Sequence, residues 1–467
     1  MRGQRFAGLS TTVVLALVLG GSGCNPHPGW DSGPGDGARI DATQPVTALF
    51  DWSISNAFDE TPMGGAPVAF GVGPGGKLAF GYYRNQAAGV PYTCTTNLGE
   101  AQWTDIELHV ARYDGAAWST DFVELIRSPD AITGAFGPDG NFYLVYMAGP
   151  STGTYCGVSQ LFYRQISASS LGTETNLVSS SASGDTCRLM QNACNAGDNP
   201  GRYPALTFLP DGRYLIAYSD THFNFAQQTD IEGADLEILI GSGAPSSGGR
   251  LCLDDCSGSG NFSAVAAGQD RRPAIATWVR ISHQFNLQGC ADDAPASGTY
   301  SWPRGIYFWQ ETPSGTWAHK QVADVEVAQK LALAYTATDG YVIAYKRGAA
   351  LAAYTSADGT TFTHTIIDQR GNTGASPVAA VDPQGRMFIA YAREAAAPAG
   401  TPNTNDDGIW LATRSSGVWK SELVVNDPDS RDGVEVFLAI DPDSGNPVIA
   451  YRNATTNRFM IARGTPK

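Results

Sequence analysis

The sequence predicts an all-β protein, a seven-bladed β-propeller with four-stranded antiparallel blades, on two observations. First, one unit occurs seven times: an apolar strand, a tight turn of the Asp-Gly type and a second apolar strand that ends on an aromatic residue. Second, the copies recur at intervals of about 60 residues, and a hairpin cannot bury both of its faces without its neighbours. Stacking such units around an axis gives a propeller. The copies occupy 67–82, 131–146, 204–218, 263–278, 331–345, 377–391 and 437–451.

The N-terminal region predicts export and a lipid anchor. Residues 1–23 have the features of a secretory signal peptide: a basic start, an apolar run too short to span a membrane and a final stretch of small residues. Cys24 follows directly, in a context that resembles a bacterial lipobox, whose cysteine is diacylated. We therefore expect a lipoprotein of the outer membrane or cell surface, with a periplasmic or secreted chain as the alternative. Residues 24–45 are rich in Gly, Pro and Asp and predict a flexible tether.

The remaining residues, 46–467, predict a single propeller domain. A second hairpin with a glycine turn follows several of the first hairpins, which gives four antiparallel strands per blade. These second hairpins are expected at 108–125, 306–322, 351–367 and 409–425. The seventh repeat has only a third strand, 458–463, whereas a strand at 46–54 precedes the first hairpin without a partner. We therefore expect the strand at 46–54 to complete the last blade and close the ring.

The lengths of the connections distinguish the two faces of the predicted propeller. Turns inside each hairpin are short, whereas the long segments join the second strand to the third or the fourth strand to the next blade. All of these long connections open on one face, here called the looped face. Loops on a rigid scaffold commonly carry function, so the looped face is the expected ligand face. The long segments are 85–104, 147–160, 179–202, 219–234, 253–261, 281–304, 394–408 and 426–433.

The net charge indicates which classes of partner to exclude, and the cysteine content indicates how an exported chain is cross-linked. The formal net charge is −15, and no basic run interrupts it, so binding to nucleic acid or to anionic lipid is not expected. Beyond Cys24 there are seven cysteines, which in an exported chain predict disulfides rather than metal thiolates. Spacing suggests the pairs Cys94 with Cys156, Cys187 with Cys194 and Cys256 with Cys290, and Cys252 as the free thiol.

Polar residues recur two positions after the aromatic residue that ends each repeat. Four of them are arginines, which suit a carboxylate, sulfate or phosphate; alternatively, each arginine pairs with a carboxylate at its own strand end. In the third and fourth repeats, histidines follow closely, so two imidazoles and a carboxylate could combine in metal or acid/base chemistry, or could simply be solvated. The candidate ligand-binding residues are Arg84, Asp220, His222, Arg280, His283, Arg347 and Arg393.

One segment resembles the start of a calcium-binding loop. Asn403, Asn405 and Asp407 supply oxygen side chains at its first, third and fifth positions, and Gly408 follows at the sixth. The twelfth position is Arg414 where a calcium loop has glutamate, so a turn rich in Asn and Asp is the simpler interpretation. Calcium is the one cofactor that the sequence suggests. No P-loop, GxSxG or HExxH motif is present.

The repeat unit resembles the BNR, or sialidase-like, propeller repeat found in lipoproteins predicted in myxobacteria and similar bacteria. The resemblance rests on hairpins such as DPQGRMFIAY followed by turns such as SSGVW, and it extends over 46–467. A sialidase Asp-box reads Ser-x-Asp-x-Gly-x-Thr-Trp; the nearest stretch here, 356–362, is one residue shorter, and the Arg-Ile-Pro motif is absent. The resemblance therefore implies the fold and does not carry over the catalytic residues.

The sequence thus predicts a surface-tethered binding or scaffold protein that recognises an extracellular glycan or protein through its looped face. The alternative is a sialidase-like glycoside hydrolase or lyase acting on an anionic sugar, in which the arginines would clamp a carboxylate. We favour binding over catalysis because the scaffold is complete while no catalytic constellation can be assigned.

Overall fold

In the computed structural model, all described residues belong to one compact unit within 36–467. The described residues are 48–64, 66–85, 91–96, 99–127, 131–149, 159–179, 199–224, 229–254, 259–279, 304–325, 327, 330–370, 372–394, 408–415, 417–426, 435–453 and 456–467. Only the backbone is described at 91–96, 99–104, 199, 221–224, 229–234, 394 and 415.

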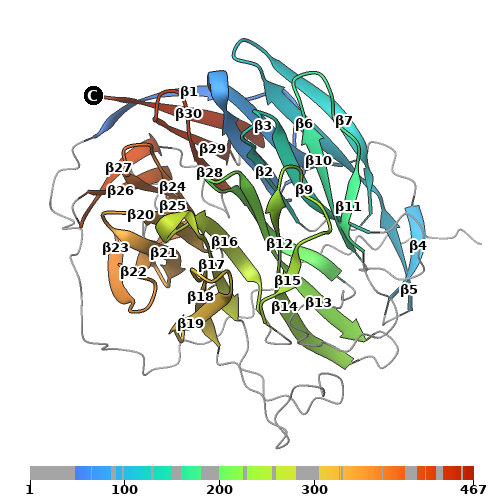
Figure 1. Cartoon of the computed structure of the whole chain (residues 1–467). Helices are drawn as coiled ribbons and strands as arrows, with labels where there is room; N and C mark the ends of the chain where they lie inside the picture. Colours follow the sequence, from blue (N-terminus) through green and yellow to red (C-terminus); the bar gives the residue numbers. More distant parts are fainter. Residues whose placement is uncertain are drawn as a thin grey trace, which may run out of the picture. The chain divides into compact units, whose positions relative to one another are not determined.

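The predicted fold is confirmed: seven four-stranded antiparallel sheets form the blades of a β-propeller (Figure 1). Blade 1 consists of β2 (Val68–Gly73), β3 (Lys77–Arg84), β6 (Ile106–Tyr113) and β7 (Trp118–Ile126). Blade 2 consists of β8 (Ile132–Phe136), β9 (Phe142–Ala148), β10 (Gln160–Ile166) and β11 (Thr175–Val178). Blade 3 consists of β12 (Asn199–Phe208), β13 (Arg213–Asn224), β14 (Thr229–Ser242) and β15 (Arg250–Cys252). Blade 4 consists of β16 (Asn261–Ala267), β17 (Pro273–Val279), β18 (Gly305–Glu311) and β19 (Trp317–Ala323). Blade 5 consists of β20 (Ala332–Thr336), β21 (Gly340–Arg347), β22 (Ala350–Ser356) and β23 (Thr363–Asp368). Blade 6 consists of β24 (Asn372–Val381), β25 (Met387–Glu394), β26 (Gly408–Ser415) and β27 (Val418–Asn426). Blade 7 consists of β28 (Val436–Ile440), β29 (Pro447–Asn453), β30 (Arg458–Pro466) and β1 (Phe50–Asn56).

The first strand of each blade, here called its inner strand, contacts the inner strands of both neighbouring blades. The contacts run from β2 through β8, β12, β16, β20 and β24 to β28, and β28 contacts β2 again. The inner strands therefore form a closed ring. Each chain connection from one blade to the next leads into the start of an inner strand, so these starts lie on the looped face.

The N-terminal strand closes the ring, as predicted. β1 pairs antiparallel with β30, so that Phe50 lies opposite Pro466 and Asn56 opposite Met460; in Figure 1 the blue β1 runs beside the red β30. The strand begins at Phe50 and is displaced by a few residues from the expected 46–54. Glu422 of blade 6 holds the start of this segment, because its carboxylate accepts hydrogen bonds from Leu49 N and, at 3.0 Å, from Trp52 Nε1.

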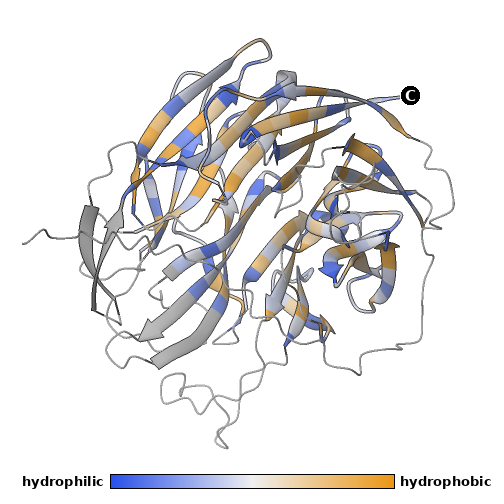
Figure 2. Cartoon of the chain, turned by 180° about the vertical axis from the view of Figure 1, so that it is seen from behind, coloured by the Kyte–Doolittle hydropathy of each residue, from blue (hydrophilic) through white to orange (hydrophobic). Residues whose placement is uncertain are grey.

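Seven clusters of buried apolar side chains fill the spaces between consecutive blades. Between blades 7 and 1, for example, Phe437 and Phe459 pack with Phe70 and Phe80. Hydrophobic residues, orange in Figure 2, run along the strands. Because each blade is apolar on both faces, its strands can be buried only between two other blades.

The hairpin that resembles an Asp-box has a structural role. Ser356 Oγ accepts a hydrogen bond from Gly359 N at 2.9 Å, and Asp358 Oδ1 accepts one from Thr360 N at 2.8 Å. These hydrogen bonds, the one from Thr360 N foremost, lower the pKa of the Asp358 carboxyl to about 2. Phe362 packs edge-on against Phe308 of blade 4 at 5.3 Å. This turn therefore fastens blade 5 to blade 4.

Two local features differ from the prediction. The segment 85–104, expected as a loop, contains a two-stranded sheet of β4 (Pro91–Thr96) and β5 (Gly99–Thr104). The run PYTCTT is rich in β-branched and aromatic residues and carried the signal for it. In the part of the chain that the structure describes, no helix is both long and apolar enough to cross a membrane.

Candidate functional site

The predicted arginines occupy the ends of second strands and have local partners. Arg84 Nη1 lies 3.4 Å from Glu60 Oε2, which agrees with the alternative of local ion pairing. Arg347 Nη1 lies 3.3 Å from the Nε2 atom of His364 in the same blade. Arg393 Nε donates to the carbonyl oxygen of Arg370, and its guanidinium lies 4.7 Å from the centroid of the Trp410 ring. Within the described residues no contact joins Arg84, Arg347 and Arg393, and their role in ligand binding stays a prediction.

Asp220 belongs to a buried polar network in blade 3. Its carboxylate lies 3.4 Å from Arg250 Nη2, and Arg250 also contacts Glu237 at 2.7 and 2.8 Å. Tyr218 donates its hydroxyl hydrogen to Glu237 at 2.5 Å, and both Asp220 and Glu237 are fully buried. Burial raises the pKa of the Glu237 carboxyl, and Arg250 acts in the opposite direction. The network joins the strands of blade 3 and has no opening to solvent at its carboxylates.

The predicted correspondence between blades 3 and 4 is wrong by one residue. The repeat tyrosines pack toward the preceding blade; Tyr218, for example, lies in the cluster between blades 2 and 3. Trp278 instead packs toward the following blade, in the cluster that contains Tyr345. Thr277 takes the tyrosine position in blade 4, so Val279 corresponds to Asp220. Arg213 and Arg272 accept the hydrogen bonds that close the two equivalent turns, and the fifth residue after them is Tyr218 in blade 3 and Thr277 in blade 4.

Other predicted sites fall outside the described residues. They are Arg280, His283, the calcium loop residues Asn403, Asn405 and Asp407, the lipidation site Cys24, the cysteines at 156, 187, 194, 256 and 290, and the side chains of His222 and Cys94. In the described part of the chain, no cluster of three His, Cys, Asp or Glu residues could hold a metal ion. Cys252 is disulfide-bonded, so the expectation that it is the free thiol is wrong. Its partner is not among the described side chains.

Three inner strands share an irregularity at their starts on the looped face. In blades 3, 4 and 6 a β-bulge interrupts the pairing with the second strand. Each bulge holds a non-glycine residue with left-handed backbone: Tyr203 at φ 50°, Phe262 at φ 53° and Ser376 at φ 49°. Such conformations cost about 1–2 kcal/mol for an L-residue. Bulges redirect side chains and are enriched next to functional sites.

Two of the redirected side chains are aromatic and contact each other. The rings of Tyr203 and Phe262 meet edge-to-face, with centroids 4.8 Å apart and an interplanar angle of 60°. Phe262 in turn stacks on Trp278 at 5.8 Å and 14°. Trp278 Nε1 donates to Val325 O at 3.2 Å, which fixes the indole. Tyr203 is 36% exposed, so the inner two rings support an outer ring that solvent can reach.

A cation and a carboxylate from non-adjacent blades meet at the same end of the inner strands. Lys330 precedes β20 of blade 5, and its Nζ lies 5.0 Å from the centroid of the Phe437 ring in blade 7. Glu435 precedes β28 of blade 7, and its Oε2 lies 3.7 Å from Arg452 Nε. Because blade 6 lies between them, Lys330 must extend across the ring of inner strands. Lys330 as a whole residue is exposed.

The protonation of this pair is perturbed by its surroundings. Desolvation lowers the pKa of the Lys330 ammonium, and the charge of Glu435 acts in the opposite direction. Burial raises the pKa of the Glu435 carboxyl, against the charges of Arg452 and Lys330. Perturbed titratable groups are typical of functional sites. Tyr203, Phe262, Lys330 and Glu435 all stand at or just before the starts of inner strands on the looped face, and we call this set the axial site.

The sequence analysis did not identify the axial site, because it searched the ends of the second strands. The available signal was a glycine two residues before the redirected side chain: Gly201 precedes Tyr203, and Gly260 precedes Phe262. Both glycines have positive φ, at 104° and 78°. A second signal was that Lys330 and Glu435 stand at the corresponding strand starts of blades 5 and 7.

Comparison with known proteins shows no family for this chain. No protein-family model matches the chain, and no curated protein matches it. A protein of unknown function from Dyadobacter fermentans is similar at 11% identity, with 89% of this chain and 98% of that chain covered and a TM-score of 0.44. An α-L-arabinanase of Penicillium chrysogenum, complexed with arabinobiose, has 9% identity, coverages of 79% and 99%, and a TM-score of 0.42. The Aleuria aurantia lectin, complexed with Fucα1-6GlcNAc, has 10% identity, coverages of 78% and 97%, and a TM-score of 0.40. At these values the assignment of function rests on the residues of this chain alone.

Proposed function

We propose that this protein is an extracytoplasmic glycan-binding protein, tethered to the cell surface through Cys24, and that it holds a sugar chain at the axial site. The observation that carries the proposal is the exposed ring of Tyr203, which a strained bulge holds against Phe262 on the looped face. Strain of this kind persists where it serves a purpose, and presenting an aromatic ring to a ligand is such a purpose.

The chemistry of the axial site suits a carbohydrate. Ligand sites combine aromatic surface with a few polar groups that fix orientation. The Tyr203 ring offers a flat apolar surface to the C–H face of a sugar, while the Lys330 ammonium can donate to hydroxyl oxygens and Glu435 can accept from hydroxyl groups. A protein partner is the other class that a looped face can bind, and it would engage the loops without requiring a sugar-sized surface.

A glycan array with the mature chain, residues 25–467, tests the proposal. We expect one group of related glycans to bind, and Tyr203→Ala to weaken that binding by about tenfold or more, which corresponds to about 1.4 kcal/mol. Phe122→Ala is the matched control, because Phe122 is 50% exposed on the outer strand β7 of blade 1. Equal loss in both variants, or an array without any bound glycan, would contradict the proposal. Repeating the array with calcium and with chelator tests the predicted calcium loop.

A sialidase-like hydrolase or lyase is the second candidate, because Glu435 has the raised pKa that a general acid requires. Glycoside hydrolysis needs a pair of carboxyl groups on either side of the bond. Glu435 is the carboxylate that the described residues bring to the axial site. Turnover of a sialoside or uronide substrate that is abolished by Glu435→Gln would favour the enzyme over the binding protein.

A further inference from the structure

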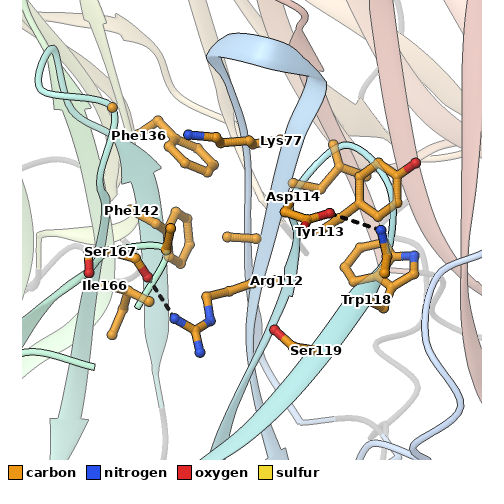
Figure 3. Close-up of a pocket in the computed structure, with 15 residues that line it drawn as sticks. Lys77, Arg112, Tyr113, Asp114, Trp118, Ser119, Phe136, Phe142, Ile166 and Ser167 are labelled. Carbon is orange, nitrogen blue, oxygen red and sulfur yellow. Dashed lines mark hydrogen bonds between the residues drawn. The ribbon is translucent and has the colours of Figure 1, made fainter. Parts of the chain in front are cut away.

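A cavity lies between blades 1 and 2, on the face of the short turns and therefore at the opposite end of the strands from the axial site. Its volume is about 160 Å³. Figure 3 shows Lys77 and Arg112 of blade 1 on one side and Phe136, Phe142 and Ser167 of blade 2 on the other. The two phenylalanine rings pack against glycines of β2, where even a Cβ atom on Gly73 would lie 2.5 Å from Phe136.

Lys77 is a cation without an anion. It begins the second strand of its blade, and its side chain forms no hydrogen bond or ion pair among the described residues. Arg213 begins the second strand of blade 3 and does have partners: its Nε lies 2.7 Å from Asp211, and its two terminal nitrogens each lie 3.1 Å from Glu311 of blade 4. Arg386, just before the second strand of blade 6, pairs with Asp382 at 2.5 Å. Arg272, just before the second strand of blade 4, pairs with Asp270 at 3.4 Å, so the same position carries a neutralised cation in three other blades.

The sequence explains why Lys77 lacks a counter-ion. The first turn of blade 3 is Pro210-Asp211-Gly212, whereas that of blade 1 is Pro74-Gly75-Gly76, so glycine replaces the turn carboxylate. Across the groove, the third strand of blade 2 ends at Ile166 and Ser167 follows, whereas the third strand of blade 4 ends at Glu311. Both carboxylates that neutralise Arg213 are therefore missing around Lys77.

Arg112 contributes a second free donor to the same cavity. Its Nη1 donates to Ser167 O at 2.6 Å, and its Nη2 pairs with Asp121. Its Nε–H is buried and has no hydrogen-bond partner. A buried donor without a partner is unfavourable, so the Arg112 side chain gains if it turns this N–H toward an acceptor that enters the cavity.

We propose that this groove binds one acidic sugar residue, a hexuronate, with its carboxylate between Lys77 and Arg112 and its ring against Phe142 and Ile166. Asp121 pairs with Arg112 and Asp114 also lines the cavity, so the Lys77 ammonium, which has no ion-pair partner among the described residues, is the group that selects a carboxylate. The apolar wall suits the C–H face of a sugar ring, and the hydroxyls of Ser119 and Ser167, which both line the cavity, suit its hydroxyl groups. The site is independent of the axial site, because it lies on the other face and shares no residue with it.

Titration calorimetry of the mature chain with glucuronate, galacturonate, glucose and benzoate tests this proposal. We expect the uronates to bind, the neutral sugar to bind at least tenfold more weakly, and salt to weaken the uronates. Lys77→Met should reduce uronate affinity at least tenfold; it keeps an apolar stem, and because Lys77 has no partner to lose, the variant should fold. Lys420→Met is the matched control, since Lys420 is exposed on the outer strand of blade 6 and should leave affinity unchanged.

Three results would overturn the proposal: no binding of either uronate, affinity unaffected by Lys77→Met, or benzoate binding more tightly than the uronates, which would assign the groove to aromatic acids. Tyr203→Ala distinguishes this site from the proposed axial one, because it should remove array binding and retain uronate affinity. Loss of uronate binding in Tyr203→Ala would instead place the uronate at the axial site.

Discussion

The repeat tyrosines pack their rings between blades and also donate a hydrogen bond from the hydroxyl group. The hydroxyl of Tyr82 donates to Glu60 at 2.7 Å and that of Tyr391 to Asp368 at 2.7 Å, and Tyr218 uses Glu237 in the same way. Sequence reasoning assigned these rings to packing alone, and it could not supply the acids, because they lie at different sequence distances from each tyrosine. A buried tyrosine hydroxyl needs a hydrogen-bond acceptor, so some acceptor is expected at each position. Which residue supplies it depends on the tertiary structure.

Removing one such hydroxyl tests its contribution. Tyr218→Phe keeps the ring and leaves the buried Glu237 with one donor fewer, so it should lower the free energy of unfolding by about 1–3 kcal/mol. Chemical unfolding followed by tryptophan fluorescence measures this change. Tyr163→Phe is the control, since Tyr163 is only partly buried and should shift stability by less than about 0.5 kcal/mol. Equal effects of the two substitutions would show that the hydroxyl of Tyr218 contributes nothing specific.

The buried carboxyl of Glu422 predicts a pH dependence of stability. Burial raises its pKa, and the hydrogen bonds from Leu49 N and Trp52 Nε1 act in the opposite direction. The folded chain therefore retains this proton to higher pH than the unfolded chain, whose glutamates titrate near about 4.3. Between the unfolded and the raised folded pKa, the folded state binds more protons, so stability falls as pH rises through that window.

Glu422→Gln should remove this dependence, so that the wild-type chain loses stability relative to the variant as pH rises through the window. Unfolding midpoints measured from pH 4 upward provide the comparison. Asp59→Asn is the control, because the Asp59 side chain is 95% exposed. A constant difference between wild type and Glu422→Gln at every pH would mean that the carboxyl does not titrate within the window.

Hairpins were the elements most readily predicted, because their turns have a recognisable composition. Pro-Asp-Gly between two apolar runs predicts a tight turn that needs a residue with positive φ, and Gly212 indeed has φ 85°. The bulges of the inner strands were missed, because their one local signal is a glycine two residues before the left-handed residue, as Gly201 stands before Tyr203 and Gly260 before Phe262. A single glycine does not distinguish a bulge from a turn. The axial site depends on them and was missed for the same reason.

The left-handed backbone of a turn glycine can be tested by a substitution that introduces no steric clash. Gly212→Ala introduces a Cβ that meets nothing within 4 Å, so its cost comes from the left-handed backbone alone, about 1–2 kcal/mol. Gly248→Ala is the control, because Gly248 does not have positive φ and its nearest atom, Ser246 Oγ, lies at 3.7 Å. Thermal denaturation should separate the two variants; similar melting temperatures would contradict the assigned turn conformation.

The whole molecule depends on one strand from the start of the chain. The sequence predicted this closure correctly from a count of strands, since blade 7 lacked a fourth strand and the strand at 46–54 lacked a partner. Without β1, blade 7 would expose the edge of β30 and the apolar cluster that includes Phe50 and Phe388. The strand β1 is therefore needed to close the ring of blades.

Truncation tests the closure. Deleting 46–56 from the mature chain should give an aggregating or unfolded product, as judged by size-exclusion chromatography and thermal denaturation. The control is a chain that begins at residue 46, which lacks only the predicted tether and should melt like the mature chain. A chain without 46–56 that melted at the same temperature would show that the ring closes without β1.

The most direct test of the account is a crystal structure of the mature chain with the oligosaccharide selected on the glycan array. The account predicts a sugar ring stacked on Tyr203, with hydroxyl groups within hydrogen-bonding distance of Lys330 and Glu435. An oligosaccharide bound elsewhere on the propeller, with the axial site left empty, would contradict it.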